Sequence, residues 1–216
     1  MATIVVFLGW IFSLCLHEFS HALVAYCGGD TSVKEKGYLT FNPLKYTDPL
    51  FSLVYPLVFL LIGGLGLPGG CVYIDRTRLR SATWETAVSL AGPASNALLA
   101  VVLALPFTLG FVDPATRDWY WAVLAFLVQL QVSAVLFNLM PIPPLDGFGA
   151  LAPWLPPETQ TKLYGYSQYG LWIVFLVFWY VPGVNSVFWG IVYDIVAFLG
   201  VSPQLGWEGY QLFKVW

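Results

Sequence analysis

The sequence predicts an all-α polytopic membrane protein with about five to six transmembrane or re-entrant helical segments and a small re-entrant β element. Of the 216 residues, 58% are hydrophobic and only 10% are charged, whereas a soluble domain has about 25% charged residues. The apolar residues are gathered in stretches without charge, several of which reach the ~20 residues that a spanning helix needs. These stretches are 1–16, 49–74, 86–112, 119–145 and 163–193.

The remaining composition excludes other classes of protein. The net charge is −3 and the nine Lys and Arg residues form no basic stripe, so no nucleic-acid partner is expected. Three cysteines are too few for a disulfide framework and lack metal-type spacing, which indicates small apolar packing residues. The N-terminus lacks the basic flank and cleavage pattern of a signal peptide, so the first helix is expected to remain.

The first apolar segment contains both histidines of the chain, in "LCLHEFSHALVAY" at residues 14–26. Residues four apart share one face of a helix, so His17 and His21 can direct two imidazoles at one ion. Glu18, about 100° further round the helix, can reach a water bound to that ion, as in the HExxH arrangement of zinc hydrolases. A charge at the centre of a membrane helix costs about 2.5–3.5 kcal/mol. This cost favours a metal site over a packed polar cluster.

A zinc site also needs a third protein ligand, with one position left for water. The chain has no third histidine and Cys15 faces another side of the helix, so the ligand must be an acid. Asp146 follows a helix broken by prolines, in "FNLMPIPPLDGFGAL", and irregular backbone at membrane depth is tolerated where it lines a cavity. Asp194 lies on a regular helix, where an interhelical hydrogen bond or interfacial exposure is expected. The pattern favours Asp146.

The depths of the polar residues predict the helix directions. The histidines lie near the end of a helix that exits at about Cys27, Asn96 lies early in a helix from about Trp84 to Leu109, and Asp146 ends a helix from about Trp119. The histidines, Asn96 and Asp146 reach the same depth in the membrane only if the first and third helices run opposite to the second. The stretch 49–70 must then not cross fully, and its prolines and glycines favour a re-entrant segment.

Basic residues give an independent indication of orientation. Six of the nine flank the stretch 49–70 on both sides: Lys34, Lys36, Lys45, Arg76, Arg78 and Arg80. If this stretch is re-entrant, all six share one face, which the positive-inside rule assigns to the cytoplasm. The site is then expected towards the cytoplasmic side. The apolar run is nevertheless long enough to span, and in that case the six residues are divided equally.

The C-terminal third of the sequence contains fewer candidate functional residues. The stretch 163–193 can hold two short crossings that divide near Pro182-Gly183. The tail at 201–216 is amphipathic and aromatic, which favours an interfacial segment over a lid near the site.

Three motifs in order resemble the site-2 protease family of intramembrane zinc metalloproteases. They are "HEFSH" (17–21), "AGPASN" (91–96) and "NLMPIPPLDG" (138–147). The segment "GYLTFNPLKYTDPL" (37–50) is similar to an insert of small prokaryotic members, although Tyr46 stands where the family pattern has histidine. No PDZ or nucleotide-sensing domain is expected, so the chain resembles a minimal member.

The resemblance implies a role for each motif residue. His17, His21 and Asp146 would bind one zinc ion per chain, and Glu18 would act as general base. Asn96 would donate its side-chain amide to the tetrahedral intermediate. The small residues around Asn96 alternatively form a helix-packing surface, and both roles can hold together.

The segment "LPGGCVYID" (67–75) resembles the family's extended re-entrant strand. An exposed strand edge can pair with a substrate main chain, so Cys71, Val72, Tyr73 and Ile74 are candidate substrate-binding residues. A plain interfacial loop is the alternative. The chain is accordingly expected to be a single membrane-embedded metalloprotease domain (1–216). It would comprise a core at 1–150, gating helices at 160–200 and an interfacial tail at 201–216.

The expected activity is hydrolysis of peptide bonds within transmembrane segments of membrane proteins, so the expected partners are such a substrate and the lipid bilayer. A non-catalytic adaptor that binds transmembrane helices is the main alternative. A di-iron oxidase generally needs more than two histidines. A transporter would place further intramembrane charges along a pathway, and Asp194 is the one candidate.

Overall fold

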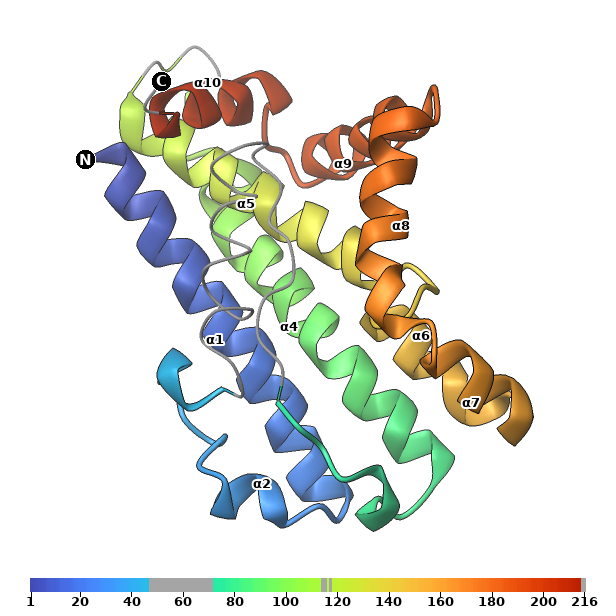
Figure 1. Cartoon of the computed structure of the whole chain (residues 1–216). Coiled ribbons are helices and arrows are strands. Elements are labelled where there is room, and N and C mark those ends of the chain that lie inside the picture. Colours follow the sequence, from blue (N-terminus) through green and yellow to red (C-terminus); the bar gives the residue numbers. More distant parts are fainter. Residues whose placement is uncertain (47–71, 114–115, 117, 215–216) are drawn as a thin grey trace.

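The computed structural model describes residues 1–46, 72–113, 116 and 118–214, which are mostly helical (Figure 1). Among these described residues, three helices are long and apolar enough to cross a membrane, namely α1 (Ala2–Gly28), α4 (Ala82–Thr108) and α5 (Trp119–Asn138). Large apolar side chains point outward from them, including Leu8 at 59% and Leu98 at 65% exposure. Such apolar surface suits lipid rather than water, and the chain is therefore a membrane protein.

The other helices of the described residues are shorter. They are α2 (Ser32–Glu35), η1 (Pro43–Lys45), η3 (Arg76–Arg78), α6 (Asp146–Leu151), η4 (Ala152–Trp154), α7 (Pro157–Tyr164), α8 (Ser167–Tyr180), α9 (Val184–Phe198) and α10 (Pro203–Phe213).

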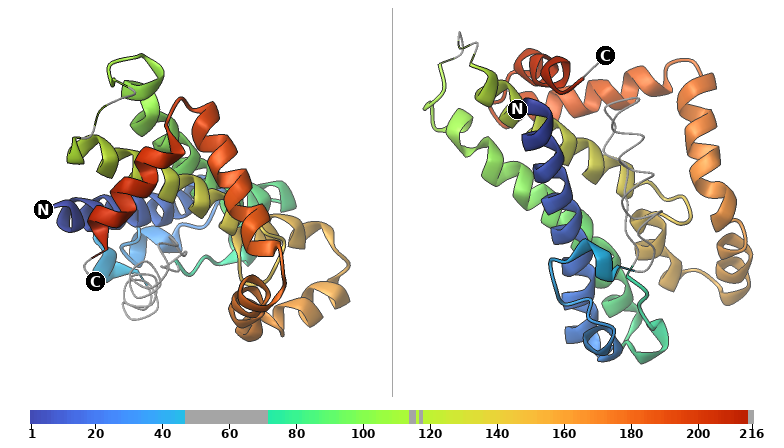
Figure 2. Two further views of the ribbon diagram at one scale, coloured as in Figure 1. Left: turned by 90° about the horizontal axis from the view of Figure 1, so that it is seen from above. Right: turned by 60° about the vertical axis from the view of Figure 1, so that its left-hand side comes forward.

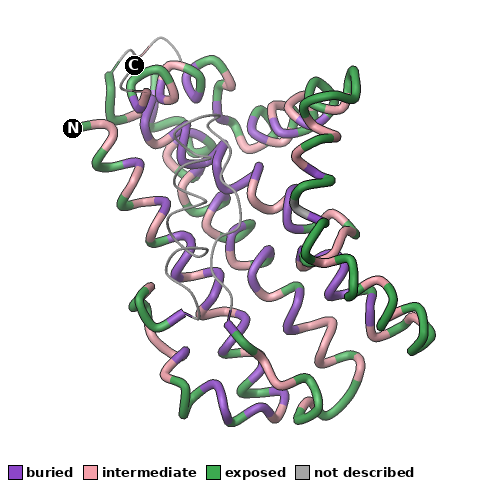
Figure 3. Tube along the Cα trace, viewed as in Figure 1, coloured by how far each residue is buried: buried purple, intermediate pink, exposed green. Residues whose placement is uncertain are grey.

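The long helices run in the directions that the sequence predicts. α1 and α5 descend in the view of Figure 1, and α4 ascends beside both. The buried residues of α1 and α4 alternate with exposed ones along each helix, whereas α5 is buried on all sides over residues 125–133 (Figure 3). α4 begins at Ser81, whose hydroxyl accepts a hydrogen bond from the Trp84 N–H, a usual helix N-cap. α5 ends at Asn138, shortly before the prolines of the next loop, which cannot continue a helix.

The predicted β element is not supported, because the described residues contain no strand. Residues 67–71 of that prediction lie outside the described part of the chain, and residues 72–75 have no regular secondary structure. Side chains satisfy their backbone groups instead. The N–H of Val72 donates to Glu18 Oε2 at 3.1 Å, the N–H of Asp75 donates to Asp30 Oδ2 at 2.8 Å, and Lys36 Nζ donates to the Tyr73 carbonyl at 3.0 Å.

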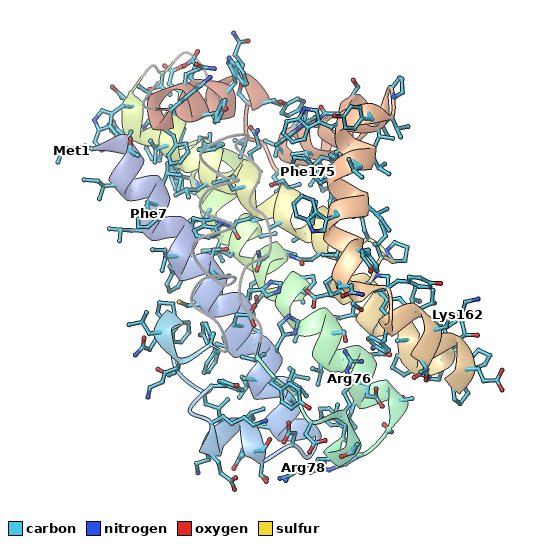
Figure 4. All side chains as sticks on the ribbon, viewed as in Figure 1. Met1, Phe7, Arg76, Arg78, Lys162 and Phe175 are labelled. Atoms are coloured by element: carbon cyan, nitrogen blue, oxygen red, sulfur yellow. The ribbon has the colours of Figure 1, made fainter. Side chains whose placement is uncertain are left out.

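The residues on either side of 47–71 lie close together, beside Cys15 and Glu18 of α1. Tyr46 and Val72 are buried in one cluster with Cys15 and Val88. The Arg80 N–H donates to the Gly28 carbonyl at the end of α1, and Figure 4 shows Arg76 and Arg78 near this end of the bundle. Basic residues from both sides of residues 47–71 thus lie in the same half of the bundle. The predicted re-entrant path of 49–70 lies outside the described residues.

Of the C-terminal helices, α8 and α9 project from the bundle, whereas α10 packs against it (Figure 2). α8 and α9 meet at 94° across Pro182-Gly183, the point at which the sequence predicts a break, and Gly183 has a φ of 88° that suits glycine. α10 lies across α5, with Phe213 buried against Val6, Trp10 and Phe126. Thr3 Oγ1 also donates to the Phe213 carbonyl at 3.3 Å, so the start of α1 and the end of α10 are in contact.

Close packing of α10 depends on Gly206 and Gly209. A Cβ atom at Gly209 would overlap the Ala122 carbonyl oxygen, and one at Gly206 would lie 2.6 Å from Gln129 Oε1. The amphipathic tail that the sequence assigns to the interface is therefore packed against a spanning helix in the structure.

Substitution of Gly209 by alanine is expected to destabilise the protein, because the added methyl forces α10 away from α5. Overpacking costs about 1–3 kcal/mol, and a chain of this length loses about 2–4 °C in Tm per kcal/mol. Thermal unfolding in detergent measures the shift. Gly190→Ala is the matched control, since a Cβ at this helical position meets nothing within 4 Å and alanine favours helix. An equal loss in both variants would contradict the packing argument.

Candidate metal centre

Three polar residues of α1 converge at one level of the helix. His17, Glu18 and His21 are 5%, 4% and 6% exposed, although each bears a titratable group. One turn separates the two histidines, and their Nε2 atoms lie 3.0 Å apart. The helical spacing therefore brings both imidazoles to one point, as the sequence predicts.

Asp146 is placed against the two imidazoles by the loop that follows α5. It is the first residue of α6, and its Oδ2 lies 3.2 Å from His17 Nε2 while its Oδ1 lies 3.4 Å from His21 Nε2. The adjacent Gly147 allows this loop to fold back tightly, because a Cβ there would overlap the Leu139 carbonyl. The other candidate acid, Asp194, is exposed on α9.

The donor set fits a zinc ion. In the described part of the chain, His17, His21 and Asp146 form the group that could hold a metal, with ligand atoms within 4.8 Å of one another. Zinc bonds of about 2.0–2.1 Å in tetrahedral geometry separate neighbouring ligand atoms by about 3.3 Å, and the separations here are 3.0, 3.2 and 3.4 Å. Asp146 Oδ2 is also buried without a hydrogen-bond partner. A cation would satisfy that oxygen.

The outer nitrogen of each imidazole faces an oxygen on α4. His17 Nδ1 lies 3.1 Å from Asn96 Oδ1, and His21 Nδ1 lies 2.6 Å from the Val88 carbonyl. A carbonyl oxygen accepts but cannot donate, so each Nδ1 must carry the hydrogen. Both Nε2 atoms then present lone pairs towards Asp146. Acceptor atoms alone thus meet at the centre, which is the arrangement of a cation site.

Gly92 leaves the space in which these atoms meet. A Cβ atom there would overlap the Nε2 atoms of both histidines. Val88, Gly92 and Asn96 are spaced by four residues, so one face of α4 supplies a carbonyl, a gap and an amide in turn. The sequence predicts a role for Asn96 and, through the small residues of "AGPASN", a helix-packing surface that includes Gly92. Val88 was not predicted, because a backbone carbonyl leaves no signal in the sequence.

Glu18 and the predicted substrate segment are directly linked. The Val72 N–H donates to Glu18 Oε2 at 3.1 Å, and Val72 is buried. Tyr73 is exposed and Ile74 is partly buried, while Cys71 lies outside the described residues. The structure therefore places this segment beside the acid of the HExxH motif. Its role in binding a substrate stays a prediction.

Known proteins similar to this chain are named as zinc metalloproteases. "Putative zinc metalloprotease Rip2" of Mycolicibacterium smegmatis is 49% identical over 213 residues, which cover 99% of this chain and 81% of the relative. The Mycobacterium tuberculosis protein of the same name is 44% identical over the same shares. "Putative zinc metalloprotease YwhC" of Bacillus subtilis is 34% identical over 83% of this chain and 81% of its own length. No protein-family model and no solved structure matches.

Proposed function

Because this chain belongs to the site-2 protease family, we propose that it is a zinc endopeptidase that hydrolyses peptide bonds within transmembrane segments of membrane proteins. Its relatives' names support a zinc metalloprotease, and the membrane character of the chain supports the location of the reaction. The proposal assigns one zinc ion per chain to His17, His21 and Asp146.

The observation that carries the proposal is the meeting of acceptor atoms inside a membrane bundle. Two imidazole Nε2 atoms and a carboxylate lie 3.0–3.4 Å apart, next to a buried glutamate on the same helix. A zinc ion would offset the charges of Asp146 and Glu18, which makes their burial tolerable. An adaptor that only binds helices has no use for this set of groups.

Zinc held by these residues supplies Lewis acidity towards water and a substrate carbonyl. Glu18 would accept the proton of the attacking water as general base and then pass it to the leaving amine as general acid. The bond from Val72 occupies Oε2 of Glu18, which leaves Oε1 for this exchange. Basic residues gather at the end of the bundle that is nearer to the proposed zinc site, and the positive-inside rule therefore supports a site towards the cytoplasmic side.

The zinc assignment is tested by Asp146→Ala. Loss of an outer hydrogen-bond partner of a ligand costs about 10–100-fold in metal affinity, so loss of a ligand is expected to cost more. Metal analysis of purified protein should give about one zinc per wild-type chain and little in the variant. Asp194→Ala is the control, because Asp194 is an exposed acid away from the centre. Equal zinc in all three proteins would contradict the ligand assignment.

The reaction itself is tested with a synthetic transmembrane peptide in liposomes that contain the wild-type protein. Mass spectrometry of the products locates the cleaved bond, which is expected within the apolar segment and to require zinc. Cleavage confined to the water-exposed flanks would indicate an ordinary membrane-bound protease. No cleavage of any of several such peptides by zinc-loaded protein would contradict the proposed function.

A further inference from the structure

We propose that Asn96 is a positioning residue that acts through His17, with its side-chain carbonyl fixing the imidazole so that Nε2 faces Asp146. The inference rests on the proposed zinc site. It assigns Asn96 a role different from the one implied by the family resemblance, in which the side-chain amide donates to the reacting carbonyl.

The contact that carries the inference is local and buried. Asn96 is 4% exposed, and its Oδ1 lies 3.1 Å from His17 Nδ1. Oδ1 is therefore the atom of the amide that faces His17 on α1.

The same face of α4 also holds the second histidine. The Val88 carbonyl accepts a hydrogen bond from His21 Nδ1, as Asn96 Oδ1 does from His17 Nδ1, and Gly92 lies midway between the two acceptors in the sequence. A helix that presents acceptors two turns apart would lock both rings in one tautomer. Of these two acceptors, only the one on Asn96 belongs to a side chain and can be removed by substitution.

Free rotation of an imidazole would allow either nitrogen to face the centre. With Nδ1 held by Asn96, only Nε2 is available, and no ordering of the ring is needed when the ion binds. Removal of the acceptor is therefore expected to weaken zinc binding, although Asn96 is not itself a ligand. Removal of a residue that hydrogen-bonds to a metal ligand usually lowers metal affinity by about 10–100-fold.

Two variants distinguish the role of the Asn96 side-chain oxygen, a hydrogen-bond acceptor, from that of its NH₂ group, a donor. Asn96→Asp keeps an oxygen for His17 but has no amide, whereas Asn96→Leu has neither group at similar size. Zinc affinity is measured by chelator competition on folded, purified protein. We expect Asn96→Asp to bind zinc as tightly as wild type or more tightly, and Asn96→Leu to bind about 10–100-fold more weakly. Leu98→Ala, exposed to 65% on the same helix, should bind as wild type.

A spectroscopic measurement distinguishes positioning from a general loss of structure. The chain has two histidines, so selective ¹⁵N labelling of histidine gives four ring nitrogens. In Asn96→Leu the His17 signals should change their tautomer pattern while those of His21 stay as in wild type. If Asn96→Leu does not fold, Asn96→Ser is compared with Asn96→Asp instead. Asn96→Asp is then expected to bind zinc more tightly than Asn96→Ser.

Two results would overturn the inference. One is a loss of zinc affinity that is equal in Asn96→Asp and Asn96→Leu. The other is unchanged zinc affinity and unchanged His17 signals in Asn96→Leu, accompanied by slower cleavage in both variants, which would make the amide a donor to the substrate. The zinc and NMR measurements need no substrate. A failure to find proteolysis would therefore affect the proposed function and leave this inference testable.

Discussion

Replacement of Glu18 by glutamine is expected to abolish measurable peptide cleavage while the protein keeps its zinc. Glutamine has the shape of glutamate but cannot accept a proton, and proton transfer by a positioned group contributes about 10²–10⁴-fold to a rate. The amide can still accept the hydrogen bond from Val72 through its carbonyl, so the 3.1 Å contact need not be lost. Initial rates on the same transmembrane peptide, with metal analysis of the same sample, measure both quantities.

Glu35→Gln provides the matched control for this change, because Glu35 is exposed on the short helix α2. It should cleave at the wild-type rate. A Glu18→Gln protein that cleaves normally would remove the general base from the mechanism. If wild type and variant bound transmembrane helices equally and neither cleaved them, the adaptor alternative would replace the protease.

Gly92→Ala is expected to empty the zinc site and to remove activity with it. The new Cβ would overlap the Nε2 atoms of His17 and His21, so α1 and α4 must separate or the imidazoles must turn away. Either movement breaks the ligand geometry. Zinc affinity should fall by more than the about 10–100-fold loss caused by an outer-partner change.

Alanine favours helix over glycine by about 1 kcal/mol, so α4 itself should still form in this variant. Thermal unfolding of the zinc-free proteins checks that point, and Gly190→Ala supplies the same chemical change at a helical position with open space. Wild-type zinc content in Gly92→Ala would show that α4 does not approach the centre as described.

The spanning helices could be predicted because their signals are local. The helix expected from about Trp84 to Leu109 is α4 (Ala82–Thr108), and the exit expected at about Cys27 is the end of α1 at Gly28. Apolar runs fix where these helices lie, and polar or proline-rich segments fix where they end. The convergence of the two histidines with Asp146 followed from helical spacing and from the lack of other suitable ligands.

Features that depend on long-range contacts could not be predicted in this way. The extended segment at 72–75 pairs with Glu18, Asp30 and Lys36 rather than with another strand, and an apolar sequence pattern does not distinguish these partners. The amphipathic pattern of the tail fits a lipid interface and a helix surface equally well. The packing of Phe213 against Phe126, and the close approach of the helices at Gly206 and Gly209, identify α5 as its partner.

The contact between Thr3 and Phe213 determines what fusion reporters can reveal about membrane topology. The start of α1 and the end of α10 lie together, at the end of the bundle away from Arg76 and Arg78 (Figures 1 and 4). A fluorescent protein that matures only in the cytoplasm should therefore give one and the same answer at either terminus. Opposite signals from the two fusions would mean that α10 has left its place on α5 in the cell.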